Sequence, residues 1–253
     1  MKIRHIRNAT MLIETNKHVF LVDPMLSEKG SMPSYTEKRF NPQKNPIVKL
    51  PQQTKEQLSK VTHCIITHLH SDHLDKAGEK FLRENKIPVI CSTNDAEELK
   101  KRGLNIFKII KYWHQSEFQG VSIDGIPAKH GYGKVAELMG NVMGYFIRYK
   151  NKSVYLSSDT IYTAAVDKVL KSFKPDISVL ACGSAQLDKH EPILMTMKDI
   201  LIFIENASGH VIANHMEAVN HCPTTREMLT EALKEKKLSK KVWIPDDGEE
   251  KLF

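Results

Sequence analysis

Short apolar runs separated by polar turns indicate strands at the start of the chain. Met11-Leu12-Ile13 and His18–Val22 are two such runs, and Thr15-Asn16-Lys17 between them has the composition of a turn. Asp23-Pro24 ends the second run, so the first 22 residues are predicted to form strands. Residues 25–54 are rich in Pro, Ser, Lys and Asn and show no period, which predicts a long surface loop.

Strands and helices alternate from residue 64 onward. The predicted strands cover residues 64–67, 106–110, 121–126, 144–149, 153–157, 177–181, 211–213 and 242–245, the last of them closing the chain. The predicted helices cover residues 93–103, 164–173, 196–206 and those from 224 on. Thr196 with Asp199, and Thr224 with Glu227, have the spacing of capping boxes. This order predicts an α/β (α+β) fold in which helices cover two sheets.

The composition is that of an ordinary globular domain. Hydrophobic residues make up 41% of the 253 residues and charged residues 26%, which excludes a disordered or fibrous chain. The four cysteines are scattered without a CxxC pair, so free thiols in a reducing cytosol are expected. No linker divides the chain, and residues 1–253 are predicted to form a single domain.

Neither a membrane span nor an export signal is predicted. The longest clean apolar run, Ile200–Ile204, is far shorter than the roughly 18 residues that a spanning helix needs. The first residues, MKIRHIRNATMLIE, carry charges where a signal peptide needs an apolar stretch, so a cytoplasmic location is expected. The net charge of +7 fits either a lysine-rich solvated surface or attraction to anionic substrates.

One segment directly after the strand 64–67 carries the strongest chemical signal. It places His68, His70, Asp72 and His73 within six positions. Imidazole and carboxylate groups are ligands for Zn²⁺ and similar ions. A turn at this place points the first two histidines one way and the other two groups the opposite way, so the pattern suits two neighbouring ions better than one.

Further ligands must come from elsewhere, because four groups are too few for two ions. His130, Asp159 and His215 stand out, since each lies where a predicted strand runs into a turn, and such ends gather ligands in α/β-type folds. His221 is either a cleft residue that binds substrate or passes protons, or a solvent-facing residue at the start of a helix. The sequence leaves open whether His190 lines the same cleft.

Together these features resemble the metallo-β-lactamase-fold hydrolases. The resemblance rests on the run HLHSDH at residues 68–73, on Ser158-Asp159-Thr160 and on the two later strand-end histidines, and it covers the chain from about residue 21 to residue 217. Within that superfamily the chain is similar to a bacterial group of small stand-alone metal-dependent hydrolases, which is itself similar to the ascorbate-6-phosphate lactonases. The resemblance implies an αββα four-layer sandwich with metals in a cleft at one edge of the two sheets.

The resemblance also implies seven ligands around two divalent metal ions. They divide into His68, His70 and His130 for the first ion, and Asp72, His73 and His215 for the second. Asp159 would bridge the two ions, and Asp23 would hold a histidine of the cluster by a hydrogen bond. Zn²⁺ is the favoured ion, although Mn²⁺ and Fe²⁺ suit the same donors. Antibiotic hydrolysis is not expected, because the chain lacks an export signal and has Asp159 where the lactamases often use cysteine.

The predicted reaction is hydrolysis of a small substrate, with anionic substrates favoured. A hydroxide held between the two ions would attack an ester, lactone, amide or phosphodiester, with Asp72 and Asp159 as ligands, one of which also accepts a proton. Two alternatives stay open: a nucleic-acid phosphodiesterase of the same fold, supported only by the basic charge, and a non-hydrolytic metal-binding or sensor protein. A small molecule is the expected partner, nucleic acid and membranes are disfavoured, and a homo-oligomer is left open.

Overall fold

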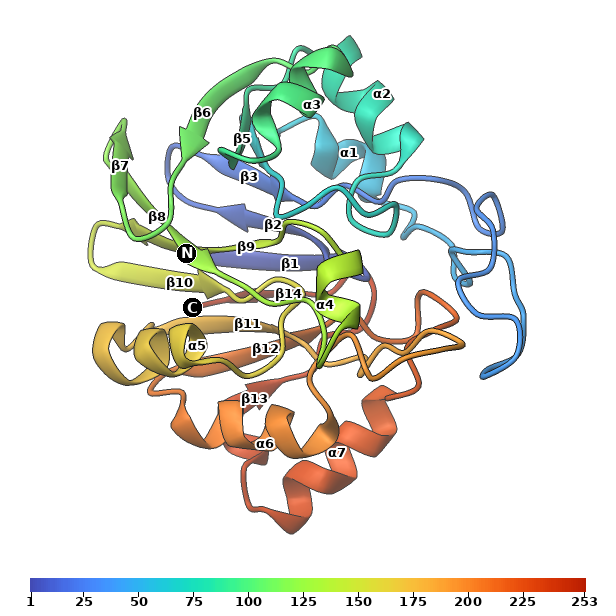
Figure 1. Cartoon of the computed structure of the whole chain (residues 1–253). Coiled ribbons are helices and arrows are strands. Elements are labelled where there is room, and N and C mark those ends of the chain that lie inside the picture. Colours follow the sequence, from blue (N-terminus) through green and yellow to red (C-terminus); the bar gives the residue numbers. More distant parts are fainter.

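Two mixed β-sheets lie face to face in the computed structural model, which describes residues 1–253 (Figure 1). The strands of the first sheet are β1 (Lys2–Arg7), β2 (Thr10–Glu14), β3 (Val19–Val22), β4 (His63–Ile65), β5 (Val89–Ser92), β6 (Ile106–Ile110) and β14 (Glu250–Leu252). Their order in the sheet is β14-β1-β2-β3-β4-β5-β6. The pairs from β14 to β3 are antiparallel, and those from β3 to β6 are parallel.

The second sheet repeats this design. Its strands are β7 (Gln115–Phe118), β8 (Val121–Pro127), β9 (Met143–Tyr149), β10 (Lys152–Leu156), β11 (Ile177–Ala181), β12 (His210–Asn214) and β13 (Val242–Trp243). Their order is β13-β12-β11-β10-β9-β8-β7. The pairs from β7 to β10 are antiparallel, and those from β10 to β13 are parallel.

Helices cover the outer face of each sheet, which makes four layers (Figure 1). The helices over the first sheet are α1 (Thr54–Leu58), α2 (Lys76–Glu84) and α3 (Ala96–Lys101). Those over the second sheet are α5 (Ala164–Lys168), which a π-helical turn over Val169–Phe173 extends, α6 (Met197–Asn206) and α7 (Arg226–Glu235). The short α4 (Val135–Leu138) lies at the end of the sandwich, and a 3₁₀ turn (Ser239–Lys241) precedes β13. The predicted αββα sandwich is confirmed.

Three apolar clusters fill the three interfaces between these layers. Neighbouring residues of one strand belong to different clusters: Phe20 and Val22 pack between the sheets, whereas Leu21 packs under the helices of the first sheet. Phe146 and Ile147 divide in the same way in the second sheet. Because such strands are buried on both faces, the sequence shows continuous apolar runs instead of an alternating pattern.

Most predicted strands and helices are confirmed, within a few residues at their ends. The strands predicted at 106–110 and 177–181 have these bounds in the structure. All four cysteines are free, as expected, and the structure buries all of them. No helix of the structure combines the length and the apolar character that crossing a bilayer requires.

Several elements lie outside the predicted ones, and most of them have little apolar patterning; the buried strand β5 is the exception, since its apolar run was missed. Helix α2 buries only Gly78 and Leu82 among mostly charged residues. Strand β7 lies at a sheet edge and buries no residue, and β14 is exposed throughout. The strand predicted at 242–245 is therefore not the last one. The helix predicted at 93–103 begins only at Ala96, after Asp95.

Both predicted capping boxes are wrong. Thr196 precedes α6, but its side chain makes no capping hydrogen bond, and Asp199 instead accepts one from the hydroxyl of Tyr132. Helix α7 begins one residue later than predicted, with Thr225 at the cap, where its Oγ1 accepts from the Met228 N–H at 3.1 Å. Thr224 is buried and lies one residue before this cap.

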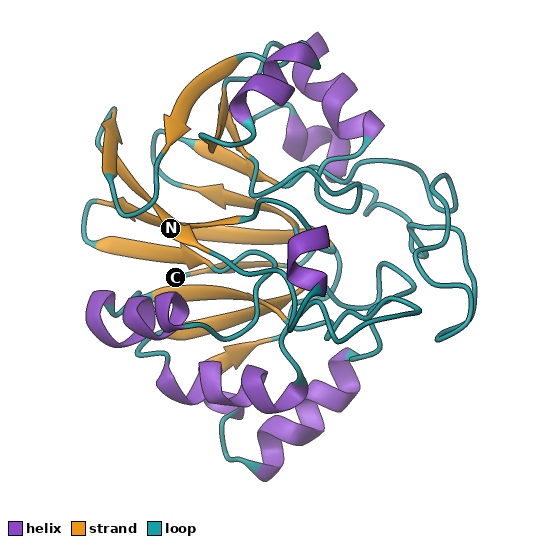
Figure 2. Ribbon diagram, in the orientation of Figure 1, coloured by secondary structure: helices purple, strands orange, loops and turns teal.

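The long loop predicted after β3 is confirmed. No helix or strand lies between β3 and α1, and the loop contains only an isolated bridge between Met32 and Asn45. Figure 2 shows that loops gather at one end of the sandwich, whereas the layers of helices lie above and below the sheets. Residues that follow the strands at this end are free to form a site.

Candidate metal centre

Four segments that follow strands come together in the folded protein. The first runs from His68 to His73 after β4, and the others place His130 after β8, Asp159 after β10 and His215 after β12. Strand β4 belongs to the first sheet, whereas β8, β10 and β12 belong to the second. The cluster therefore forms only when the two sheets are packed against each other.

The structure brings all seven predicted ligands together in three overlapping groups. The groups are His68, His70 and His130; His68, His73 and Asp159; and Asp72, His73 and His215. Within each group the donor atoms lie within 4.8 Å of one another. The first and third groups match the two predicted ligand sets, and the second group connects them.

A single oxygen of Asp159 faces both sets of histidines. Its Oδ2 lies 3.2 Å from His73 Nε2, 3.4 Å from His130 Nε2 and 3.5 Å from His215 Nε2. His130 belongs to the first predicted set and the other two belong to the second. Asp159 thus lies between histidines of the two predicted sets.

Two histidines of the first set, His68 and His130, have lowered pKa values, which favours the neutral form that binds a metal. Burial, together with the neighbouring His73 and His70, holds the pKa of His68 well below its usual value. Burial lowers the pKa of His130 to about 4, although Asp159 acts in the opposite direction. Both rings can therefore offer a lone pair at neutral pH.

Histidines of the second set are paired with carboxylates. Burial alone would lower the pKa of His73, but Asp159 and Asp23 outweigh it and raise the pKa to about 10. Burial also acts to lower the pKa of His215, but Asp159 and Asp72 outweigh it and hold this pKa well above its usual value. The Nε2 atoms of the two histidines are only 3.1 Å apart. A metal ion between these groups would displace protons from the rings.

Unpartnered buried atoms show that the residues fit a cation. His68 Nε2 and Asp159 Oδ1 are both buried and have no hydrogen-bond partner. Buried polar atoms in folded proteins are otherwise nearly always paired. A divalent ion would accept a lone pair from each of them, so this donor set suits Zn²⁺ and similar ions.

Asp23 supports the cluster from the end of β3. Its Oδ1 accepts from the Thr67 N–H at 2.8 Å, and its Oδ2 accepts from the Thr67 hydroxyl at 2.7 Å. The same Oδ2 lies 2.8 Å from His73 Nδ1. This contact fixes the ring of His73 so that Nε2 faces Asp159, which is the role that the resemblance implies for Asp23.

Other supporting groups were missed by the sequence analysis. The hydroxyl of Thr67 lies 2.9 Å from His68 Nδ1, and the thiol of Cys222 lies 3.4 Å from His215 Nδ1. His130 Nδ1 lies 2.7 Å from the carbonyl oxygen of Ile193. Thr67 and Cys222 stand close to ligands in the sequence, which is a weak signal. A backbone carbonyl from a distant loop leaves no signal at all.

Hydrogen bonds join the two sheets directly behind the cluster. The hydroxyl of Tyr145 in β9 donates to the carbonyl oxygen of Ile66 after β4 at 2.9 Å. Asn8, after β1, receives the His215 N–H on its carbonyl oxygen at 2.9 Å. The side-chain amide of Asn8 donates to the carbonyl oxygen of Asp72 at 2.9 Å. These bonds fix the spacing between ligands that come from different sheets.

The backbone around the cluster is strained at three residues that have side chains. Asp23, Ser158 and His215 have φ values of 45°, 58° and 58°, in the left-handed region that non-glycine residues rarely adopt. Such conformations collect at functional sites, where the surrounding structure enforces them. Gly183 is also required, since a Cβ there would lie 2.2 Å from the carbonyl oxygen of His215.

A cavity of about 200 Å³ opens beside the first group. It is lined by His70, Asp72, His130, His221, Tyr35, Ser71, Met139, Leu187 and Ile193. His221 is only 5% exposed, so the alternative of a solvent-facing residue is wrong. Burial lowers the pKa of His221 to about 4, and its Nδ1 has no hydrogen-bond partner. His190 is exposed and does not line this cavity.

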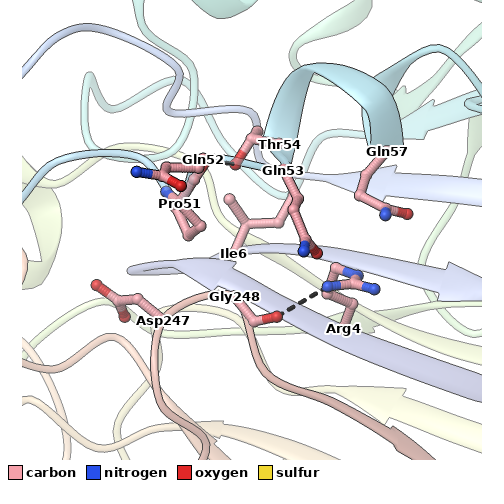
Figure 3. A pocket seen from close by; sticks show the side chains of 9 residues that line it. All are labelled: Arg4, Ile6, Pro51, Gln52, Gln53, Thr54, Gln57, Asp247 and Gly248. Carbon is pink, nitrogen blue, oxygen red and sulfur yellow. Dashed lines mark hydrogen bonds between the residues drawn. The ribbon is translucent and has the colours of Figure 1, made fainter.

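A second polar cavity lies apart from this cluster. It has a volume of about 280 Å³ and is formed by β1, residues 51–57 and the segment around Gly248 (Figure 3). Arg4 donates to the carbonyl oxygen of Gly248 at 2.9 Å across its floor. None of the predicted ligands lines this cavity, so it is not part of the candidate metal centre.

Comparison with known proteins adds an independent line of evidence. The sequence profile of the beta-lactamase superfamily domain matches residues 18–230. The chain is 34% identical to the UPF0173 protein YddR of Bacillus subtilis, and the match covers 100% of both chains. It is 27% identical to a UPF0173 metal-dependent hydrolase of Ruegeria pomeroyi, with 72% of this chain and 74% of that protein covered.

A solved structure matches the whole fold. The isothiocyanate hydrolase from Delia radicum gut bacteria superimposes with a TM-score of 0.91 at 31% sequence identity. The superposition covers 100% of this chain and 99% of that one.

Proposed function

Because the chain belongs to the beta-lactamase superfamily and is a metal-dependent hydrolase of the metallo-β-lactamase fold, we propose that the seven candidate ligands, with Asp159 among them, form its active site. The resemblance to metallo-β-lactamase-fold hydrolases that the sequence indicates is confirmed. The further likeness to the ascorbate-6-phosphate lactonases stays a prediction.

The proposed site holds two divalent metal ions, with Zn²⁺ as the favoured ion. His68, His70 and His130 would hold one ion, and Asp72, His73 and His215 the other. The observation that carries this proposal is the position of Asp159 Oδ2, within 3.5 Å of histidines from both sets. A mononuclear site would not need a carboxylate between the two sets.

The ions would supply a hydroxide at neutral pH and polarise the group that it attacks. The protein's own residues orient the groups that take part in this reaction. Asp23 keeps the His73 ring turned toward Asp159, and the carbonyl of Ile193 does the same for His130. His221 borders the same cavity as a neutral imidazole, so it can accept a proton at Nδ1 and pass it to the leaving group.

The cavity favours a small, uncharged substrate. Its lining includes the apolar side chains of Met139, Leu187 and Ile193 and the ring of Tyr35, but no lysine or arginine. The anionic substrate that the family resemblance favours would therefore have only the proposed metal ions, and no cationic side chain, to bind it. A solved relative of the same fold is an isothiocyanate hydrolase. We therefore propose an isothiocyanate as substrate: water adds to the central carbon of R–N=C=S, and the adduct separates into the amine and carbonyl sulfide.

We expect the metal-loaded protein to hydrolyse allyl isothiocyanate, as measured by release of allylamine. A chelator should abolish this activity, and added Zn²⁺ should restore it, because the ions supply the nucleophile. Phenyl acetate and bis(p-nitrophenyl) phosphate serve as comparison substrates for the ester and phosphodiester reactions. Faster turnover of the phosphodiester than of the isothiocyanate would show that the substrate class is wrong.

The proposed dinuclear centre predicts a metal content of two ions per chain. Protein purified without chelator and then saturated with Zn²⁺ should contain close to two equivalents by elemental analysis. The seven candidate ligands in overlapping groups are the physical reason for this number. Binding of at most one ion at saturating metal would rule out the dinuclear centre.

Nuclease activity has less support than small-molecule hydrolysis. The net charge of +7 is its only independent indication, and the cavity beside the ligands lacks the cationic side chains that bind phosphates. No specific observation favours a purely metal-binding or sensor role. The cluster opens onto a cavity of about 200 Å³, which such a role does not need.

A further inference from the structure

The loop between β3 and α1 is attached to the rest of the protein at both ends. Arg7, at the end of β1, is fully buried, and its Nη2 donates to the carbonyl oxygens of Met25 and Ser27 at 2.7 and 3.0 Å. Its Nη1 donates to the carbonyl oxygen of Val48 at 3.1 Å. A single side chain therefore holds the beginning and the end of the loop.

Asn220 holds the middle of the loop from the segment between His215 and His221. Its Oδ1 accepts from the Tyr35 N–H at 2.9 Å and from Asn45 Nδ2 at 3.1 Å. Its own backbone N–H donates to Asn45 Oδ1 at 2.9 Å. The backbone of Tyr35 is thus fixed relative to the two histidines.

Asp188 attaches the turn that directly follows Tyr35. Its carboxylate accepts from the backbone N–H groups of Glu37 and Lys38 at 2.9 Å and of Arg39 at 2.8 Å. This carboxylate belongs to the loop after β11, which also contributes Leu187 to the cavity. The loop that carries Tyr35 is therefore a fixed wall of the cavity.

The side chain of Tyr35 reaches the cavity from this wall. Its ring packs edge-on against His221, with ring centroids 4.9 Å apart, and its hydroxyl lies 2.7 Å from Ser71 Oγ. The cavity also contains the candidate ligands Asp72 and His130. Burial raises the pKa of the phenol, and the Asp72 carboxylate raises it further, so the hydroxyl keeps its proton and can donate it in a hydrogen bond.

We propose that Tyr35 binds the substrate and determines its specificity: its hydroxyl donates to a heteroatom of an uncharged electrophilic group, and its ring packs against the substituent. Ser71 is exposed and can turn its own hydroxyl to solvent when a substrate takes its place. A neutral O–H group donates a hydrogen bond to an uncharged heteroatom without requiring a counter-charge. The inference rests on the proposed function, because it takes the cavity of about 200 Å³ to be the substrate site.

The test compares Tyr35→Phe with the matched control Tyr112→Phe. The hydroxyl of Tyr112 donates to Asn141 Oδ1 and to the carbonyl oxygen of Val142, and this residue does not line the cavity. Each protein is loaded with Co²⁺, and thiocyanate binding is followed by the visible spectrum, which needs no turnover. Turnover of allyl isothiocyanate is measured on the Zn²⁺-loaded proteins.

We expect Tyr35→Phe to keep the metal content of the wild type and to bind thiocyanate about 10-fold more weakly, because one hydrogen bond is lost. Its kcat/KM should fall about 10²-fold, as when one donor to a developing charge is removed. Tyr112→Phe should match the wild type in both measurements.

The outcomes separate this inference from the proposed function. Weaker thiocyanate binding by Tyr35→Phe supports the role of Tyr35 even if the wild type does not turn over isothiocyanates, in which case only the proposed substrate fails. Equal kcat/KM and equal thiocyanate affinity in Tyr35→Phe and wild type, or no thiocyanate binding by either, overturn the role of Tyr35. A loss of metal in Tyr35→Phe also overturns it, because the residue would then act through the metal centre.

Discussion

Asp159→Ala is expected to lower turnover by about 10³-fold while the fold survives. This is the upper end of the loss seen when one preorganised group that stabilises a developing charge is removed. The carboxylate is 2% exposed and is the only group that contacts histidines of both sets through one oxygen. Without it, the ions would lose their shared ligand, and His73 and His215 would lose the charge that holds them in place.

The variant should be compared with Asp124→Ala. Asp124 is also a buried carboxylate, but it pairs with Arg148 at 2.7 Å and lies outside the cluster. Metal content, circular dichroism and turnover are measured on both proteins. Asp124→Ala should keep its ions and its activity. Wild-type metal content and turnover in Asp159→Ala would show that Asp159 is not part of the site.

His215→Ala and His221→Ala are expected to lose different properties, metal binding in the first and turnover in the second. His215 belongs to a ligand group with Asp72 and His73, so its loss should remove an ion first and activity with it. His221 belongs to no such group but lines the cavity. Its loss should leave two ions in place and lower kcat by ~10²–10⁴-fold, the usual contribution of a proton-transfer group.

Elemental analysis and steady-state kinetics on the two variants, side by side, decide between the roles. If His221→Ala loses an ion while His215→Ala keeps both, the late ligand is His221. Full activity of His221→Ala on the true substrate would show that His221 takes no part in the mechanism. Its burial would then serve only its packing against Tyr35.

The candidate ligands could be predicted because they are local in sequence or lie at strand ends. His68, His70, Asp72 and His73 share one turn, and the turn's residue types alone indicate a metal. His130, Asp159 and His215 are found by locating the strand before each, and these strands are recognisable by short runs of apolar, mostly buried residues. Their assignment to two sets came from a family resemblance and not from spacing.

The rest of the site could not be predicted, because it depends on contacts between distant segments. Tyr35 lies in a loop without any period, and its position follows from bonds to Asn220, which stands 185 residues later in the chain. The carbonyl of Ile193 has no sequence signature. Similarly, helix α2 and the edge strand β14 were missed because elements with few buried residues lack the apolar pattern by which strands and helices are recognised.

The hydrogen bonds between the sheets have a consequence for the choice of metal. Tyr145 and Asn8 tie the segments that carry the ligands to each other through the polypeptide itself. The donors are therefore held close to one another, and most of them are imidazole nitrogens, whereas a large ion such as Ca²⁺ takes six to eight oxygen ligands at about 2.3–2.6 Å. The placement of the donors, together with their chemistry, would thus make the proposed site favour small ions with low coordination numbers.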